Sequence, residues 1–180
     1  MRFPVAILPI LVVFAVDASA VDLESRTFEN ENVGKVSLVA PASWRPVERH
    51  HIVSGTTFYR FLPSVSGQFD FEILVNDLAH MKMEALVDKD LEIYIQNNMA
   101  SAVPQSVEGH VKALRFGVNH DGVYARLTDR APQPGEFTLF TQGVRLQGER
   151  VVLFTLYSND QDASVLERAL AAVESVRFEQ

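Results

Sequence analysis

The sequence has 180 residues and a formal net charge of −7, with 23 acidic and 16 basic side chains. The basic residues are scattered singly among acidic ones. A nucleic-acid-binding protein needs a basic stripe to neutralise phosphates, so this class is excluded. Because the chain contains no cysteine, disulfides, thiolate nucleophiles and zinc sites built on sulfur are also excluded.

Residues 1–20 have the pattern of a cleaved secretory signal. Arg2 precedes an apolar run from Phe3 to Val16, and small residues at Ala18-Ser19-Ala20 end the segment. The alternative is an uncleaved anchor, but the run contains two prolines and is shorter than the roughly 20 residues of a membrane-spanning helix. We therefore expect cleavage after Ala20, a periplasmic or secreted location, and no membrane span after cleavage.

The rest of the chain predicts one domain behind a short leader. Residues 21–33 are acidic and aperiodic, which indicates a flexible leader, and residues 34–180 contain no linker or repeat. Phe69 to Val75 alternates between apolar and acidic residues as a half-buried strand does. The stretch 56–62 before it predicts the other strand of a hairpin, joined through residues that include Pro63 and Gly67.

Two further hairpins and two helices follow. Asn-His-Asp-Gly at 119–122 separates two strand-like segments, and Gln-Gly-Glu separates 137–146 from 151–158. Residues 151–157 are apolar on both alternating faces, which predicts a central strand covered on both sides. Apolar residues at helical spacing predict helices over 84–100 and 163–176. The chain is therefore expected to be an α+β protein with a mostly antiparallel β-sheet flanked by helices, an α/β/α sandwich.

Two short motifs resemble a known superfamily. Gly34-x-Val-Ser-Leu-x-x-Pro-x-x-Trp44 opens the domain, and the last helix runs into Ser175-Val-Arg-Phe178. Together with the order of elements, these motifs resemble the PsbP-like superfamily, which includes the extrinsic photosystem II protein and the periplasmic DcrB proteins. The resemblance implies a scaffold for docking or assembly rather than an enzyme. It carries over no functional residue, because the superfamily has no shared catalytic motif.

The candidate binding residues lie where the first strand ends. Pro41 removes a backbone donor and ends the strand, while Trp44 can close the end of the core. Partner binding is predicted near Trp44, His50 and His51. The two histidines are adjacent, so in an extended segment they point to opposite faces and cannot easily share one metal ion.

A possible copper site lies at residues 80–83. His80, Met81 and Met83 offer imidazole and thioether groups, which suit copper(I), although methionines also fill gaps in cores. Asn119 and Asp121 could begin a calcium loop, but the glutamate expected near the twelfth position is missing, which favours a turn. No cofactor is otherwise expected.

The sequence contains no motif typical of catalysis, such as Gly-x-Ser-x-Gly or His-Glu-x-x-His. The resulting hypothesis is a non-enzymatic periplasmic protein of PsbP/DcrB type that binds or helps to assemble an envelope protein. The alternatives are a copper-handling protein and a small-molecule carrier with a cavity between sheet and helix.

Overall fold

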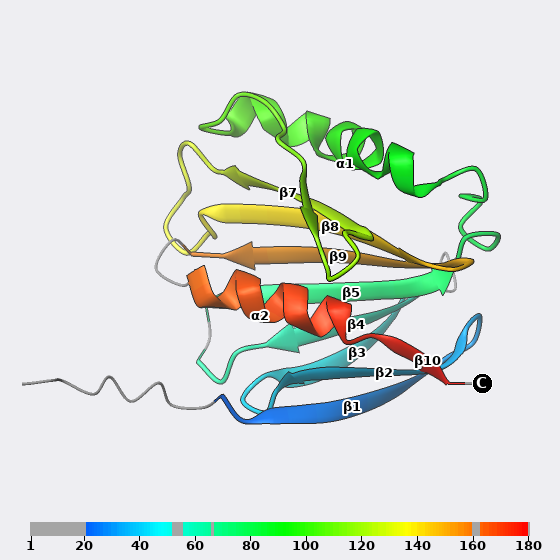
Figure 1. The fold of residues 1–180 in the computed structure, drawn as a ribbon. Helices are drawn as coiled ribbons and strands as arrows, with labels where there is room; N and C mark the ends of the chain where they lie inside the picture. Colours follow the sequence, from blue (N-terminus) through cyan, green and yellow to red (C-terminus); the bar gives the residue numbers. More distant parts are fainter. Residues whose placement is uncertain (1–20, 52–55, 66, 160–162, 180) are drawn as a thin grey trace, which may run out of the picture.

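The computed structural model describes residues 21–51, 56–65, 67–159 and 163–179. The predicted signal lies outside the described residues, so its cleavage stays a prediction. The described residues form two antiparallel sheets and two α-helices, which confirms the predicted α+β class (Figure 1).

The larger sheet contains seven strands in the order β3-β4-β5-β9-β8-β7-β6. In that order they are β3 (Arg45–His51), β4 (Thr56–Leu62), β5 (Phe69–Asp77), β9 (Arg150–Ser158), β8 (Leu139–Gln147), β7 (Gly122–Thr128) and β6 (Leu114–Phe116). The smaller sheet, in the order β1-β2-β10, consists of β1 (Leu23–Asn30), β2 (Gly34–Pro41) and β10 (Arg177–Glu179). The helices are η1 (Asp88–Asp90), α1 (Leu91–Met99), η2 (Ala100–Gln105) and α2 (Ala163–Glu174).

Strand β9 occupies the centre of the larger sheet, as its two apolar faces predicted. It pairs with β5 on one side and with β8 on the other. Val152, Phe154 and Leu156 belong to one core cluster, whereas Val151 and the partly buried Leu153 belong to the second. The α2 side of β9 is covered along its length, whereas on the other side Val151 is buried and Tyr157 is 39% exposed, so the predicted cover on both sides holds only for the first part of the strand.

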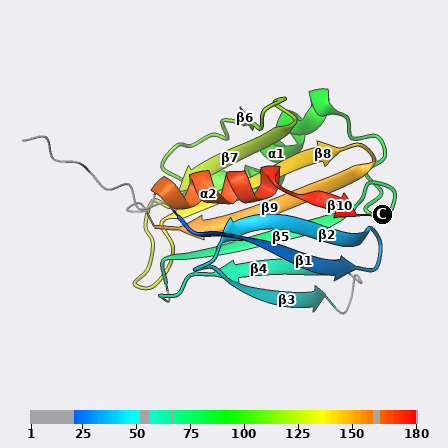
Figure 2. The ribbon, with the colours of Figure 1, turned by 60° about the horizontal axis from the view of Figure 1, so that its bottom comes forward.

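One face of the larger sheet is covered by α2 and by the smaller sheet. Val36, Leu38 and Ala40 of β2 share a buried cluster with Tyr59 and Phe61 of β4. Helix α2 packs on β2, β9 and β5, and Figure 1 shows it in front of the centre of the sheet. Figure 2 shows the smaller sheet beside it, over β4 and β5. Almost all of this face is therefore core.

The opposite face is covered only in part. Leu91, Ile95 and Met99 of α1 are buried in a second cluster, against Val123 of β7 and Val144 of β8. Helix α1 packs on β7 and β8, and Figure 1 shows it along that edge of the sheet. It runs along these strands, so the same face of β4 and β5 lies beside the helix and not beneath it.

The prediction of a flexible leader at residues 21–33 was wrong, because most of this segment is strand β1. Phe28 points inward and its ring centroid lies 4.3 Å from that of Tyr59. The buried Asn30 donates from its amide to the carbonyl of Val75 and accepts hydrogen bonds from two backbone groups. Phe28 and Asn30 are two residues apart, so they share the inner face of a strand whose acidic composition conceals the alternation.

The first predicted helix begins later than expected. Residues 84–90 form turns and η1, and α1 starts at Leu91 rather than at Glu84. Lys82 has a positive φ of 55°, and the main chain at Val87 is extended. Apolar side chains of the turns between β5 and η1 already pack on the second core cluster, which we call the α1-side cluster, so a helix is not needed to bury them. These residues are Leu78, Met81, Met83 and Leu86.

Candidate functional site

The uncovered part of the α1 side of the larger sheet is the candidate site. We call it the open face and define it by the partly or fully exposed side chains that β4, β5 and β9 present there: Phe58, Arg60, Asp70, Glu72, Thr155 and Tyr157. Residues two apart on a strand share a face, and the antiparallel register then places them in rows across the sheet.

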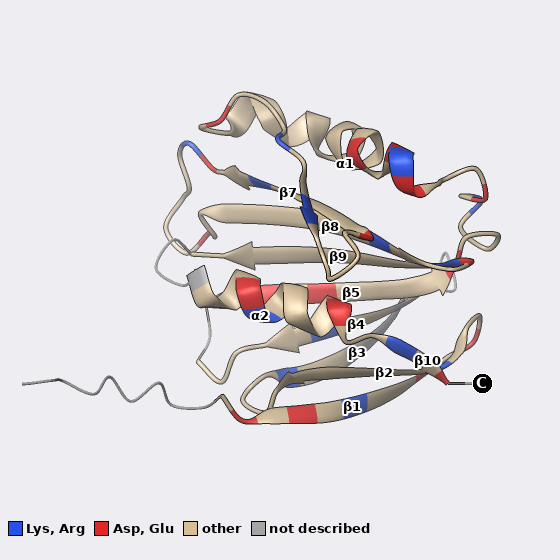
Figure 3. Cartoon of the chain, in the orientation of Figure 1, with Lys and Arg blue, Asp and Glu red and all other residues tan. Residues whose placement is uncertain are grey.

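Two rows define the polar part of the open face. Arg60 lies opposite Glu72, and Glu72 lies opposite Thr155. In the next row Asp70 lies opposite Tyr157. Figure 3 shows acidic colour on β5 and basic colour on the neighbouring β4, whose one basic residue is Arg60. Neighbours of this kind across a sheet are within side-chain contact, so the face combines an ionic group with an aromatic one.

The guanidinium of Arg60 interacts unequally with the two carboxylates of β5. Asp70 accepts hydrogen bonds from both Nε and Nη2 of Arg60, a two-bond arrangement that satisfies this carboxylate. Glu72 reaches the same Nε only at 3.6 Å, beyond hydrogen-bonding distance. Arg60 and Asp70 thus neutralise each other, and the Glu72 carboxylate keeps both acceptor capacity and a net negative charge.

Aromatic rings adjoin this ionic group. The rings of Phe140 and Tyr157 stack at a centroid distance of 5.3 Å, and Phe137 stacks on Tyr157 at 6.2 Å. Tyr157 is nevertheless 39% exposed. An aromatic cluster on an exposed sheet surface is typical of interaction surfaces, which are enriched in tyrosine and phenylalanine.

The environment of Tyr157 raises the pKa of its hydroxyl. Burial is the larger cause, and the negative charges of Glu72 and Asp70 add to it. We therefore expect the pKa of Tyr157 to lie above the ordinary tyrosine value, and Glu72→Gln to lower it because one negative charge is removed. NMR of the tyrosine rings against pH measures both. Glu29→Gln on the smaller sheet serves as control, and an unchanged pKa in Glu72→Gln would contradict this account.

A groove of about 200 Å³ separates the open face from α1. We call it the α1 groove. Its lining includes Glu72, Leu74, Tyr94, Ile95, Asn98, Gln142, Leu153 and Thr155. Helix α1 supplies one wall and strands β5, β9 and β8 supply the floor. The Oε1 atom of Gln142 is buried there and has no hydrogen-bond partner among the described residues. A buried acceptor without a donor is costly, so a donor that reached this atom would stabilise it.

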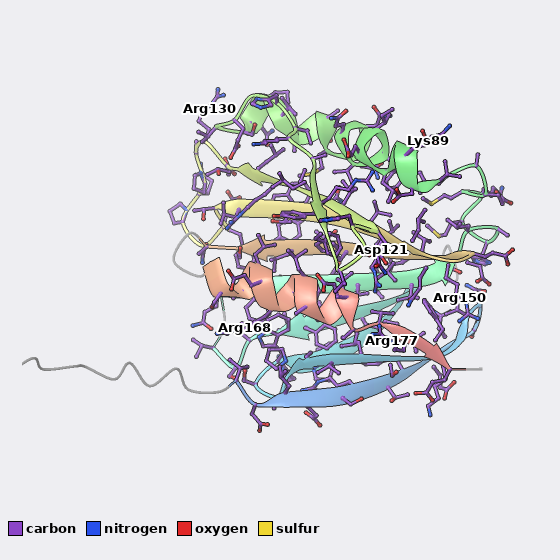
Figure 4. The ribbon with its side chains drawn as sticks, in the orientation of Figure 1. Lys89, Asp121, Arg130, Arg150, Arg168 and Arg177 are labelled. Atoms are coloured by element: carbon purple, nitrogen blue, oxygen red, sulfur yellow. The ribbon has the colours of Figure 1, made fainter. Side chains whose placement is uncertain are left out.

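A larger cleft of about 810 Å³ lies at the end of the β5 and β9 strands, beside β10. The arginines of this cleft interact with other parts of the fold. Arg150 lies 3.7 Å from Asp77, and its guanidinium lies 4.5 Å from the centroid of the Phe178 ring. Arg177 donates to the carbonyls of Glu174 and Val176. Figure 4 labels Arg150 and Arg177 at this end. These groups are engaged in joining the smaller sheet to the rest of the fold, so we assign the cleft a structural role.

Asp121 also has a structural role. Arg145 donates from Nε to Asp121 and from Nη1 to the carbonyls of Val173 and Glu174, the last residues of α2. Asp121 lies near that end of α2 (Figure 4). The arginine thus caps the helix carbonyls while its partner carboxylate balances its charge. The Asn-His-Asp-Gly segment is accordingly the hairpin turn that the spacing favours.

Trp44 is placed by the structure in the core. Its side chain is only 2% exposed, and its ring lies 4.7 Å from that of Phe69 and 5.6 Å from that of Phe71. This confirms the predicted closing of the core end by Trp44. A partner at this end would contact the residues around the indole rather than the indole itself.

The predicted histidine and methionine positions belong to two segments, strand β3 and the turns that follow β5. His50 and His51 occupy consecutive positions of β3, opposite Thr57 and Thr56, and their side chains lie outside the described residues. His80 is exposed, whereas Met81 and Met83 pack on the α1-side cluster, where the Met81 sulfur accepts from Asn76 at 3.7 Å. The described residues contain no group of three or more histidines and carboxylates that could hold a metal. Copper binding by these residues stays a prediction.

Tyr157, Glu72 and Gln142 were not singled out from the sequence. The alternation of β5 places Asp70 and Glu72 away from the main core, and that of β9 places Tyr157 on the same face as Val151. These faces could be predicted. What could not be predicted is that α1 packs over β7 and β8, since the packing position of a helix depends on contacts between residues distant in sequence.

Comparisons with known proteins find likeness in structure only. No family model and no curated protein matches the chain. The chain is similar to the solution structure of cyanobacterial PsbP from Synechocystis sp. PCC 6803, with 10% identity over 93% of this chain and 99% of that one and a TM-score of 0.49. It is also similar to a protein from Bacteroides thetaiotaomicron VPI-5482, with 9% identity over 81% of this chain and 45% of that one and a TM-score of 0.46.

The first of these structures is a PsbP protein, and the PsbP-like superfamily is the one that the sequence motifs resemble. The likeness concerns the fold alone, and no ligand, partner or residue role is transferred from either structure. Among the described residues, no helix has the length and apolar character needed to cross a membrane.

Proposed function

We propose that this protein is a non-enzymatic, exported binding domain whose open face docks a protein partner of the cell envelope. The observation that carries the proposal is the unequal cover of the larger sheet. Helix α2 and the smaller sheet bury one face, whereas α1 leaves aromatic and ionic side chains of β4, β5 and β9 exposed on the other. Exposed aromatic residues beside polar ones characterise protein interfaces.

The size of the α1 groove favours a protein partner over a small molecule. Pockets for small ligands typically enclose about 300–1,000 Å³, and the α1 groove offers about 200 Å³. A groove of this size suits one side chain of a docked protein. The export and the envelope location rest on the predicted signal at residues 1–20, and copper handling by His80, Met81 and Met83 is the alternative hypothesis.

A site-specific crosslink tests the proposal. A photoreactive benzoylphenylalanine replaces Tyr157 on the open face, and in a matched variant it replaces Val39 on β2; the two positions are 39% and 37% exposed. In the native cells we expect a discrete crosslinked product from position 157 and none of the same mass from position 39. Thr155→Arg, which fills the α1 groove, should remove the product. The same product from both positions, or none from position 157, would overturn the proposal.

A further inference from the structure

We propose that the partner presents a lysine or arginine side chain, which enters the α1 groove and binds Glu72 and Gln142. This inference rests on the proposed function and names the chemistry of the partner. Three observations carry it: the acceptors on the floor of the groove, the balance of charge around Glu72, and the apolar surface beside these acceptors.

The floor of the groove is a row of hydrogen-bond acceptors. Glu72 lies opposite Thr155, and Thr155 lies opposite Gln142 on the next strand. All three line the groove. The Glu72 carboxylate lies 3.6 Å from Nε of Arg60, beyond hydrogen-bonding distance, and among the described residues the buried Oε1 of Gln142 has no hydrogen-bond partner. A carboxylate and an amide oxygen both require donors, and lysine and arginine carry several donors and no acceptor.

The charge of the open face also favours a cation. Asp70 already balances the charge of Arg60 and occupies two of its five N–H donors, so Arg60 adds little attraction for an acidic partner. The three charges of Arg60, Asp70 and Glu72 sum to −1, and Glu72 is the least engaged of them. An acidic side chain in the groove would meet Glu72 directly, and like charges at close range in a partly buried site oppose binding.

The remaining surface of the groove fits the apolar stem of a long basic side chain. Leu74 and Leu153 lie opposite each other on the floor, and Ile95 faces them from α1. Lysine and arginine bury their methylene stems on such surfaces while the charged head reaches a polar group. The groove therefore offers the two environments that one basic side chain needs, side by side.

Peptide selection tests the inference. Random twelve-residue peptides displayed on phage are selected against the full chain, and individual peptides are then synthesised for affinity measurements. We expect selected peptides to share one lysine or arginine position. Replacing that residue by norleucine, which keeps the stem and removes the charge, should weaken binding about tenfold or more, since hydrogen bonds between charged groups are the strong ones.

Variants of the protein locate the effect. Glu72→Gln should weaken the basic peptides about tenfold, and Glu29→Gln on the smaller sheet should leave their affinity unchanged. Circular dichroism melting verifies that both variants fold. Peptides that lack a basic residue, or basic peptides that bind Glu72→Gln as well as the unchanged protein, would overturn the inference. The crosslink from position 157 is measured independently, so docking on the open face can survive a wrong assignment of partner chemistry.

Discussion

Replacing Trp44 by alanine is expected to lower the free energy of unfolding by about 3–5 kcal/mol, the range for removing a large buried aromatic side chain. The indole is almost fully buried, and its ring contacts Phe61, Phe69 and Phe71 from the end of β2. Removing it leaves a cavity between the two sheets that rigid strands cannot close. Urea denaturation followed by circular dichroism measures the change.

Two variants serve as controls for this prediction. Trp44→Phe keeps an aromatic ring against Phe69 and should lose less than half as much stability. Val39→Ala, on the preceding strand β2 and 37% exposed, should change stability by less than about 0.5 kcal/mol, as exposed positions usually do. A loss below about 1 kcal/mol for Trp44→Ala would mean that the indole is not part of the core.

Gly143→Ala is expected to destabilise the protein by about 1–3 kcal/mol, the usual cost of overpacking a core. A Cβ atom at this position would lie 2.1 Å from Cε1 of Phe154 and 3.0 Å from Cβ of Tyr124. The Phe154 ring cannot move away easily, because it packs against Phe71 and Phe116 at centroid distances of 6.3 and 5.8 Å. Thermal or urea unfolding measures the effect.

A double-mutant cycle makes the cause of this effect specific. Phe154→Leu removes ring atoms from the space that the new methyl group needs, so Gly143→Ala should cost less in that background than in the unchanged protein. Additive losses in the double mutant would show that the Phe154 ring is not what excludes a side chain at Gly143.

The residues expected to stabilise the fold and those of the proposed binding surface therefore lie on opposite faces of the larger sheet. The aromatic contacts of Trp44, Phe71 and Phe154 stabilise the face that α2 and the smaller sheet cover. Phe58 and Tyr157 lie on the other face, where cover is incomplete. Substitutions on one face are thus expected to affect unfolding, and substitutions on the other to affect partner binding.

The sequence by itself determined which residues belong to strands and which faces of those strands are apolar. The alternation in Phe69–Val75, the doubly apolar run at 151–157 and the turn at 119–122 all depend on neighbours within a few residues, and each was confirmed. The predicted α+β class follows from the same local patterns. The prediction for residues 21–33 was wrong because their polar composition conceals the alternation of a strand, which forms here by pairing with β2.

Only the tertiary structure decided where the candidate site lies. Strand order, the separation of β1, β2 and β10 into a second sheet, and the position of α1 over β7 and β8 all depend on contacts between residues far apart in sequence. Local periodicity predicts on which face of a strand a side chain lies, but not whether another element covers that face. Glu72 and Gln142 became a candidate site because α1 packs over β7 and β8 and so lies beside them, and that position is set by long-range packing.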